Sequence, residues 1–211
     1  QAYGATWNEA QTEAEFIQPA LEMLGWAYIV QSRAHHQGRV TRPDYALFAD
    51  GAARDAAYPL QDDEAAFYAH ALAIAEAKYW ERPLSKQDTA ERAVWQRREN
   101  PSHQMVSYLV GTRAPWGILT NGRVWRLYSR EVSSTASEFY EVDLADIFAA
   151  DGEMTAFKRF WLFFRRAAFV PDRAGMAFVQ RVRDGSATYA REISDKLKEL
   201  VFAEVVPEIA G

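Results

Sequence analysis

The chain of 211 residues contains no cysteine, which excludes a disulfide framework, a thiol nucleophile and a cysteine-ligated zinc site. It also lacks an apolar run of the roughly 18 residues that a membrane-spanning helix needs. No Gly-rich cofactor loop, no methyltransferase catalytic motif and no G-x-x-x-x-G-K-[ST] phosphate loop occurs. There is no leader pattern at Gln1, and the sequence stops at Gly211 directly after a helical pattern, so we expect the chain to be part of a longer protein.

Basic residues are scarce in the first third of the chain and concentrated in the middle. Overall, 24 Lys and Arg stand against 29 Asp and Glu, a net charge of −5. Residues 1–77 carry 4 basic and 11 acidic residues, whereas residues 78–130 carry 10 basic and 4 acidic ones. A basic middle beside an acidic front suits a polyanionic partner next to a carboxylate metal site, although ordinary scatter of surface charge gives the same counts.

Hydrophobic spacing predicts an α/β fold, a mixed central sheet flanked by helices with a C-terminal helical extension. A turn is expected at 33–41, an acidic loop at 50–64 and a short helix at 65–71. Strands are predicted at 26–31, 44–49 and 72–79, and longer helices at 8–24, 102–112, 144–150, 154–168 and 186–206.

Capping, glycine and proline residues define where these predicted elements begin, end or bend. Asn8 or Thr12 is expected to cap the first helix, Gly25 to end it, and Pro19 to kink it locally. Asn121-Gly122 between two apolar runs predicts a β-hairpin with a type I′ turn, because both central positions of that turn need positive φ.

Three charged residues in otherwise apolar strands are the best candidates for chemistry. Asp44 begins one predicted strand, while Glu76 and Lys78 stand two apart in another and therefore share a face. If the two strands are neighbours, the carboxylates can hold Mg²⁺, which keeps several waters and binds substrate phosphates. Lys78 would then orient the attacking water or stabilise the charge that develops on the phosphoryl group.

Each of these residues also has a structural interpretation. Asp44 after Pro43 can be a turn residue, and Glu76 with Lys78 can form a salt bridge on a solvated face. His35 and His36 lie in a predicted turn with no carboxylate at helical spacing, so a histidine metal site is not expected.

Pro43-Asp44 followed by Glu76-Ala77-Lys78 resembles the PD-(D/E)xK nuclease motif. Gln104 and Tyr108 form Q-x-x-x-Y on a predicted helix, which resembles the extra motif of RecB-like and type I restriction-subunit nucleases. Residues 8–26, 42–48 and 103–131 resemble the amino-terminal nuclease domain of type I restriction subunits and of type IIG restriction–modification enzymes. The tail over residues 138–211 resembles the helical connector that precedes the type IIG methyltransferase.

The resemblance implies a restriction-endonuclease-like nuclease domain over residues 1–133 and a helical connector over residues 134–211 toward a methyltransferase or recognition domain. It implies Mg²⁺, with Mn²⁺ as a substitute, bound by Asp44 and Glu76, with Lys78 assisting the attacking water and Gln104 supporting these three. An acidic residue in the first helix is usual in the superfamily, and Glu13 is our candidate for a metal ligand, with Glu9 as its rival on the same helix face.

The implied substrate is double-stranded DNA in a prokaryotic cytoplasm, with no membrane partner, and with oligomerisation on the DNA as an option. Methyltransferase and recognition domains would be covalently linked, and S-adenosylmethionine would bind there if at all. The candidate DNA contacts, each alternatively a solvated or core residue, are Arg82, Lys86, Arg97, Arg98 and Tyr108. The rival from another functional class is a catalytically silent nuclease fold that serves DNA binding or subunit docking.

Overall fold

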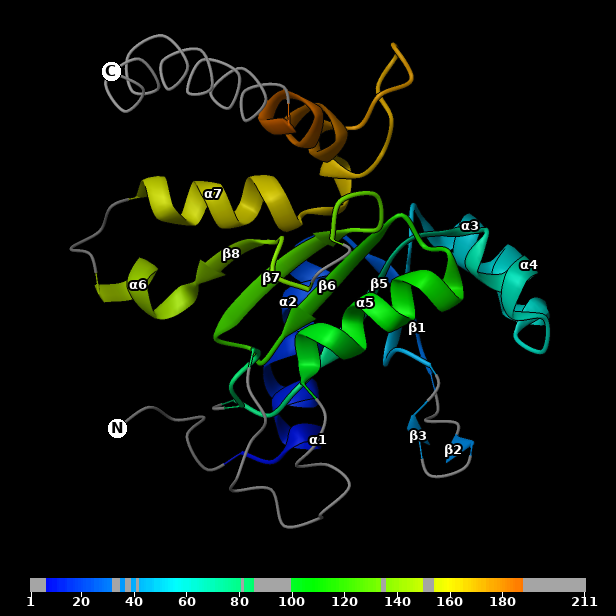
Figure 1. Ribbon diagram of the computed structural model, residues 1–211, viewed down its shortest axis with the longest axis horizontal. Helices are drawn as coiled ribbons and strands as arrows, with labels where there is room; N and C mark the ends of the chain where they lie inside the picture. Colours follow the sequence, from blue (N-terminus) through cyan, green and yellow to red (C-terminus); the bar gives the residue numbers. More distant parts are fainter. Residues whose placement is uncertain are drawn as a thin grey trace, which may run out of the picture. The chain divides into compact units, whose positions relative to one another are not determined.

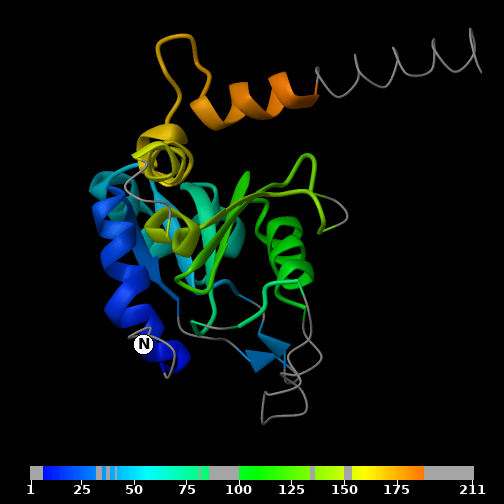
Figure 2. The ribbon, with the colours of Figure 1, turned by 90° about the vertical axis from the view of Figure 1, so that its left-hand side faces the viewer.

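The computed structural model describes residues 7–31, 35–36, 39–40, 42–80, 82–85, 100–133, 136–149 and 154–187. In this part of the chain, six strands form an open mixed sheet in the order β1-β4-β5-β6-β7-β8 (Figure 1). Only β5 and β6 run parallel, and the other neighbouring pairs of this sheet are antiparallel. Helices cover both faces of the sheet (Figure 2), so the predicted α/β class with a mixed central sheet is confirmed.

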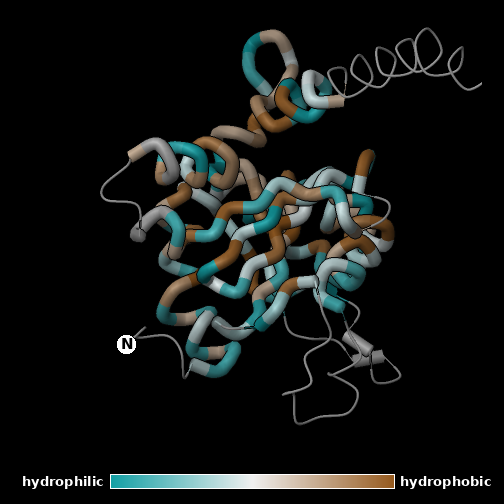
Figure 3. The backbone as a smooth tube through the Cα atoms, turned by 60° about the vertical axis from the view of Figure 1, so that its left-hand side comes forward, coloured by the Kyte–Doolittle hydropathy of each residue, from teal (hydrophilic) through white to brown (hydrophobic). Residues whose placement is uncertain are grey.

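The predicted strands are present with small shifts at their ends. The central strands are almost continuously apolar and buried, as expected where helices cover both faces. Hydrophobic residues accordingly recur along the strands of the sheet (Figure 3). The strands of the sheet are β1 Ala27–Val30, β4 Tyr45–Phe48, β5 Ala71–Ala77, β6 Trp116–Thr120, β7 Val124–Ser129 and β8 Tyr140–Asp143. A separate ribbon pairs β2 His35–His36 with β3 Arg39–Val40 inside the predicted turn.

The predicted first helix is present, and both of its ends follow the sequence signals. Asn8 caps it, because the Gln11 N–H donates to Asn8 Oδ1 (2.9 Å) while the Asn8 N–H donates back to Gln11 Oε1 (3.0 Å). Gly25, with a φ of 82°, follows its last turn. The segments are α1 Glu9–Thr12, a π-helical turn Glu13–Ile17 and α2 Gln18–Met23.

A π turn precedes Pro19, the residue at which the sequence predicts a local kink. Proline has no N–H to donate to the carbonyl oxygen four residues earlier, and its ring crowds that oxygen. The helix widens just before Pro19, and the Gln18 N–H donates to the Glu13 carbonyl oxygen, five residues back. This distortion changes which side chains of the helix share a face.

Helix α5, Pro101–Thr112, connects the parallel strands β5 and β6 and covers the face of the sheet opposite to α1 and α2 (Figure 2). Asn100 caps it by accepting a hydrogen bond from the Ser102 N–H (3.0 Å). Met105 and Leu109 are buried and pack in one core cluster with Ile74 and Leu119 of the sheet. The helix was predicted within one residue of its observed start.

The prediction of an acidic loop over residues 50–64 is wrong. This segment contains α3 Gly51–Ala57 and a 3₁₀ turn Tyr58–Leu60, and α4 Glu64–Tyr68 follows. Asp50 caps α3, since the Ala53 N–H donates to Asp50 Oδ1 (2.8 Å). Some of the acidic residues that indicated a loop are therefore helix caps. The apolar face around Ala57 is too short to show a helical repeat in the sequence.

The hairpin at Asn121-Gly122 joins β6 to β7 as predicted, but its turn is not type I′. Gly122 has a φ of 84°, whereas Asn121 is not among the residues with positive φ. Instead, the Asn121 side chain shapes the turn, because the Val124 N–H donates to Asn121 Oδ1 (2.7 Å). Asparagine acts here as a side-chain acceptor rather than as a left-handed residue.

The segment after Ser133, for which only helices were predicted, also contains a strand, since β8 adds a sixth strand at the edge of the sheet. The predicted helices α6 Leu144–Ala149 and α7 Met154–Phe164 follow it, with a 3₁₀ turn Arg166–Ala168. Residues 178–187 form a further helix that the sequence did not predict. Most of the helix predicted over residues 186–206 lies outside the described residues.

The chain divides into two compact units, Gln1–Ala167 and Ala168–Gly211. Within the first unit, Phe160 and Phe164 of α7 make edge-on contacts with the buried Trp125 ring, with centroids 5.3 and 5.7 Å apart. The domain boundary after residue 133 stays a prediction. Among the described residues, no helix has the length and hydropathy to cross a bilayer.

Candidate functional site

Asp44 and Glu76 meet on neighbouring strands. Tyr45 of β4 pairs with Ala75 of β5, so Asp44, directly before β4, stands opposite Glu76. The Asp44 N–H donates to Glu76 Oε2 (3.3 Å), and the Ala77 N–H donates to Asp44 Oδ2 (2.8 Å). Both residues are buried, with exposed fractions of 4% and 2%. The inference that the two strands are neighbours is confirmed.

Lys78 extends the same cluster. Its Nζ lies 2.6 Å from Glu76 Oε1, and the Lys78 N–H donates to the Thr120 carbonyl oxygen (2.8 Å) just beyond the last paired residues of β5 and β6. The ion pair is buried rather than on a solvated face, with 13% of the Lys78 side chain and 2% of the Glu76 side chain exposed. A charge-assisted bond at this distance fixes the ammonium group beside the carboxylate.

The strand register sets the face on which the cluster lies. Glu76 is in step with Ile74, which packs in the core beneath α5, and its partner across the parallel pair is Leu119 of the same core. Side chains two apart on a strand share a face. Glu76 and Lys78 therefore belong to the α5 side, at the end of the sheet where β5 and β6 finish.

Glu13 approaches the cluster from the first helix. The Tyr45 hydroxyl donates to Glu13 Oε2 (2.6 Å), and Gln18 Nε2 donates to the Tyr45 hydroxyl oxygen (3.3 Å). Burial raises the pKa of Glu13, against the opposing effect of the Tyr45 hydrogen bond. The charge of Asp44 raises this pKa further and that of Lys78 lowers it, so the four groups share one electrostatic environment.

The other acidic residues of the first helix lie differently. Glu9, the rival for the metal-binding role, is half-buried in the first turn of α1. Glu15 is exposed to solvent. Glu13 accepts a hydrogen bond from the hydroxyl of Tyr45, the residue next to Asp44.

Sequence reasoning missed Tyr45 and Gln18. Tyr45 is fully buried although its hydroxyl is polar, and burial raises its pKa strongly. The available signal was the period of the strand: a residue after Asp44 must point to the opposite face, toward the first helix. Gln18 gave no signal, because the π turn that brings it beside Glu13 is not written in the hydrophobic pattern.

Gln104 and Tyr108 form a pair of their own on α5. Gln104 Nε2 donates to the Tyr108 hydroxyl oxygen (2.8 Å), and in the described part of the chain the Gln104 side chain makes no other hydrogen bond. Gln104 Oε1 is buried and accepts none. Tyr108 is 5% exposed and packs in the core under α5, so its role as a DNA contact stays a prediction.

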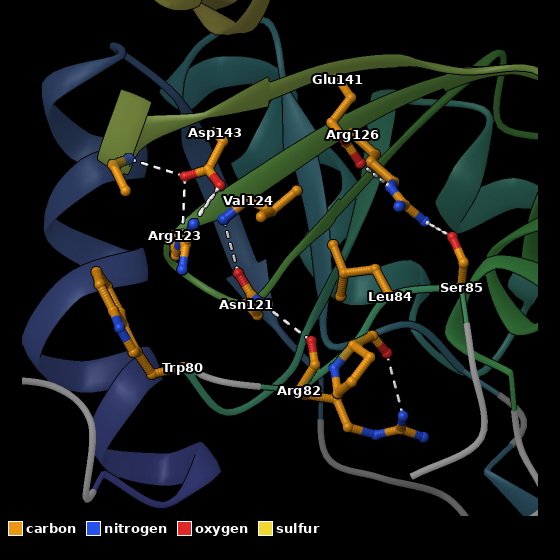
Figure 4. A pocket seen from close by; sticks show the side chains of 12 residues that line it. Trp80, Arg82, Leu84, Ser85, Asn121, Arg123, Val124, Arg126, Glu141 and Asp143 are labelled. Carbon is orange, nitrogen blue, oxygen red and sulfur yellow. Dashed lines mark hydrogen bonds and ion pairs between the residues drawn. The ribbon is translucent and has the colours of Figure 1, made fainter. Parts of the chain in front are cut away.

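A hollow of about 820 Å³ is lined by residues 80 and 82–85, by the hairpin between β6 and β7, and by residues of β7 and β8; Asp44, Glu76 and Lys78 are not among its lining residues. Figure 4 shows Trp80 at its rim, Arg82 and Leu84 along one wall, and the hairpin residue Asn121, whose side-chain amide donates to the Arg82 carbonyl oxygen (3.0 Å). Arg82 is only 2% exposed, so little of its side chain is accessible to a DNA backbone. The other predicted contacts, Lys86, Arg97 and Arg98, lie outside the described residues.

Arg126 organises the opposite wall of this hollow (Figure 4). Its Nε donates to Glu141 (2.6 Å) and its Nη1 to the hydroxyls of Ser85 (2.6 Å) and Ser102 (3.0 Å). Arg123 forms a bidentate pair with Asp143 at the mouth. Because both arginines are paired with carboxylates, the hollow is less basic than the sequence of this region indicates.

Within the described residues, no group of three or more histidine, aspartate or glutamate side chains is arranged to hold a metal ion by itself. Asp44 and Glu76 are joined by a hydrogen bond from the Asp44 N–H to the Glu76 carboxylate, and Glu13 accepts a hydrogen bond from the hydroxyl of Tyr45, the residue after Asp44. Comparison with known proteins adds nothing to this geometry: no protein-family model, no curated protein and no solved structure matches the chain.

Proposed function

We propose that this chain is a Mg²⁺-dependent DNA endonuclease domain with a restriction-endonuclease-like fold, acting within a restriction–modification or phage-defence protein of the type IIG kind. The proposal rests chiefly on one observation: Asp44 and Glu76 stand opposite each other on adjacent strands, and Lys78 Nζ lies 2.6 Å from Glu76. This is the spatial arrangement that the Pro43-Asp44 and Glu76-Ala77-Lys78 motif needs.

The donor set fits Mg²⁺ better than a tightly caged ion. Asp44 and Glu76 supply hard carboxylate oxygens from two strands, and Glu13 is a third carboxyl group in the same electrostatic environment. Mg²⁺ characteristically binds through one or two carboxylates and keeps waters and substrate phosphates as its other ligands. A site with two protein carboxylates therefore suits Mg²⁺ or Mn²⁺, and it does not suit zinc, which prefers nitrogen and sulfur donors.

The residues of the chain divide the work of phosphodiester hydrolysis among themselves. A bound Mg²⁺ supplies Lewis-acid polarisation of the phosphoryl oxygens and a more acidic bound water. Asp44 and Glu76 would hold that ion. The N–H groups of Asp44 and Ala77 donate to Glu76 Oε2 and Asp44 Oδ2, and these bonds keep the two carboxylates in place. Lys78, whose Nζ lies 2.6 Å from Glu76 Oε1, would orient the attacking water and stabilise negative charge on the phosphoryl group.

The DNA substrate is held by groups around this centre. The proposal assigns Gln104, whose buried Oε1 accepts no hydrogen bond among the described residues, to supporting Asp44, Glu76 and Lys78. Arg82 contributes to the DNA contacts from the wall of the hollow, and the proposal assigns Lys86, Arg97 and Arg98 to the DNA backbone. Recognition and methyltransferase domains, with S-adenosylmethionine if it is used, would be linked outside this chain.

A plasmid-nicking assay tests the proposal. We expect the chain to nick and linearise supercoiled DNA with Mg²⁺ or Mn²⁺ and to be silent with EDTA. Asp44→Asn and Glu76→Gln should abolish cleavage and the heat of metal binding in calorimetry. Lys78→Ala should leave metal binding in place and slow cleavage by roughly 10²–10³-fold, the loss typical of a charge-stabilising group.

Asp55→Asn is the matched control, because it makes the same chemical change at an exposed position of α3 whose partner is the neighbouring Arg54. Its nicking rate should equal that of the unchanged chain. Each variant is also melted, so that a loss of activity through unfolding is recognised. Cleavage that survives Glu76→Gln undiminished would refute the proposed active site.

Two observations favour the second candidate, a catalytically silent nuclease fold used for DNA binding or docking. Lys78 already neutralises Glu76, and no ready three-residue metal cluster occurs in the described part of the chain. In that case calorimetry gives no heat with Mg²⁺ or Mn²⁺, and Asp44→Asn does not alter DNA binding in a mobility-shift assay.

A further inference from the structure

The hollow of about 820 Å³ beside β7 and β8 has no part in the proposed metal site (Figure 4). Its volume falls in the range of pockets that hold small organic molecules, roughly 300–1,000 Å³. The lining is mixed: Trp80, Leu84 and Val124 supply apolar surface, while arginine, carboxylate, serine and asparagine side chains supply polar groups. A ligand that fits this hollow therefore combines an apolar body with several hydrogen-bonding groups.

Two polar groups of the lining are held side by side by Arg126. Its Nε donates to Glu141 Oε2 (2.6 Å), and its Nη1 donates to the Ser85 hydroxyl oxygen (2.6 Å). Arg126 is 8% exposed, and its guanidinium group lies over the Phe139 ring, 4.1 Å from the ring centroid. A buried cation with these contacts keeps the Glu141 carboxylate and the Ser85 hydroxyl at a constant separation.

Each of these two groups has a hydrogen-bonding position left for a ligand. In the described part of the chain, Glu141 Oε1 accepts no hydrogen bond, and the Ser85 hydroxyl hydrogen has no acceptor. Both residues are exposed and both line the hollow. The hollow thus presents an acceptor and a donor next to each other, anchored on one guanidinium group.

A nucleobase carries the complementary pattern. Its Watson–Crick edge has a hydrogen-bond donor beside an acceptor, and its flat aromatic ring buries well against apolar side chains. A phosphate group suits the hollow less well, because the carboxylates of Glu141 and Asp143 repel a further anion and already pair with arginines. The chemistry of the lining therefore favours a base over the sugar–phosphate backbone.

Strand register places the pair of groups on the same face of the sheet as the proposed catalytic centre. Glu76 of β5 stands opposite Leu119 of β6, which stands opposite Arg126 of β7. Arg126 in turn stands opposite Glu141 of β8, so these residues form one row across the sheet. Two strand spacings of roughly 4.8 Å put Arg126 about 10 Å from Glu76, a distance of about three nucleotides along a B-form strand.

We propose that the hollow binds an unpaired nucleotide of a DNA strand, with the Ser85 hydroxyl donating to an acceptor on the edge of the base and Glu141 Oε1 accepting from a neighbouring N–H group. The identity of the partner rests on the proposed nuclease function. The inference deepens that function, because it gives the substrate an unpaired region, such as a strand end or a gap, close to the cleaved bond. A free nucleotide carries the same base, so the experiment has to distinguish the two sources.

Fluorescence anisotropy in EDTA tests the proposal, because binding is then measured without cleavage and without a metal ion. The probes are a labelled single-stranded oligonucleotide and a strand of the same length in which abasic sites replace the nucleotides. The intact strand should bind the unchanged chain at least about tenfold more tightly than the abasic strand, within the usual effect of contacts to one base.

Two variants locate this base-dependent binding. Ala145→Phe fills the hollow from the start of α6 and leaves Ser85, Arg126 and Glu141 in place. It should weaken binding of the intact strand about tenfold and leave the affinity for the abasic strand unchanged. Ser85→Ala removes one neutral hydrogen-bond donor and should weaken binding of the intact strand by roughly 2–10-fold. It takes the place of Ala145→Phe if that variant is poorly folded in thermal melts.

Ala56→Phe is the matched control. It makes the same change as Ala145→Phe at an exposed position of α3 that does not line the hollow. Its affinity for the intact strand should equal that of the unchanged chain.

Competition with millimolar deoxynucleoside monophosphates distinguishes the two sources of the base. Displacement of the strand that is lost in Ala145→Phe supports a base site that also accepts free nucleotides. Absence of displacement, together with the loss of strand binding in Ala145→Phe, supports a site for the strand alone.

The outcomes separate this inference from the proposed function. Equal affinities for the intact and the abasic strand overturn the base site, as does a loss of binding in Ala56→Phe as large as in the variants of the hollow. Either result leaves the nuclease proposal intact, since the metal cluster is not involved. Base-dependent binding in a chain that does not cleave DNA with Mg²⁺ or Mn²⁺ overturns the nuclease alone and supports the base site.

Discussion

At the scale of single residues, the candidate site contains partly or fully buried carboxyl groups, whose burial costs folding free energy. Glu13 is removed from water in the company of Asp44, and its pKa is raised, first by burial and then by that neighbouring charge. A carboxyl group whose pKa is higher in the folded than in the unfolded chain lowers stability as the pH rises above its ordinary value of 4.5. Such strain is common where a site is arranged for a ligand rather than for stability.

Replacing Glu13 by glutamine tests this cost. In metal-free buffer, Glu13→Gln should raise the midpoint of thermal unfolding at pH 7–8, because the amide keeps an acceptor for Tyr45 but carries no charge. Since the side chain is partly exposed, we expect a gain below about 1 kcal/mol, or up to roughly 2–4 °C for a domain of this size. The gain should shrink as the pH falls toward 4, where Glu13 itself becomes protonated.

Glu15→Gln is the control for this series, since Glu15 lies on the same helix but is exposed. Its melting curve should follow that of the unchanged chain at every pH. A Glu13→Gln variant that melts lower than the unchanged chain at neutral pH would show that the ionised carboxylate stabilises the apo protein after all.

At the scale of elements, the sequence predicts what depends on local periodicity and fails where partners are distant. The first helix, α5, the hairpin and three further strands have strong apolar patterns and were predicted. β8 was missed because Tyr140–Asp143 is short, half-exposed and defined by its pairing with β7. The α3 segment was missed because its caps are acidic residues that equally indicate a loop.

Close packing between α5 and β6 is an element-scale feature that a single methyl group can probe. A Cβ added to Gly117 would lie 2.3 Å from Met105 Sδ and 3.3 Å from a Leu109 methyl carbon, so α5 or the methionine must move. Gly117→Ala should therefore destabilise the chain by about 1–3 kcal/mol, the usual cost of overpacking a core. Urea unfolding followed by circular dichroism measures the change.

Gly111→Ala provides the matched control within α5 itself. A Cβ at Gly111 meets no atom within 4 Å, so the alanine should stabilise the helix by about 0.4–1 kcal/mol. Opposite signs for the two glycine substitutions would establish that α5 lies against β6 as described. Equal, neutral effects would contradict that packing.

At the scale of the whole molecule, the site depends on strand order. The antiparallel pairing of β4 with β5 places residue 44 opposite residue 76, and the parallel pairing of β5 with β6 places Lys78 beside Thr120. No local pattern specifies which strands are neighbours, so composition and spacing identified the candidate residues but only the motif resemblance predicted their meeting. Tyr45 and Gln18 stayed hidden because their roles follow from helix–sheet packing.

The extent of the folded unit offers the final prediction, with chains shortened to residues 1–133 and 1–167. The shorter one lacks β8 and α7, so it exposes Trp125 and loses the Phe160 and Phe164 rings that cover it. Removing one buried phenylalanine typically costs 3–5 kcal/mol of a total stability of about 5–15 kcal/mol. We therefore expect residues 1–167 to unfold cooperatively in urea and residues 1–133 not to do so. A sharp transition at an unchanged midpoint for residues 1–133 would instead favour the boundary predicted from the sequence, with α7 as a dispensable connector.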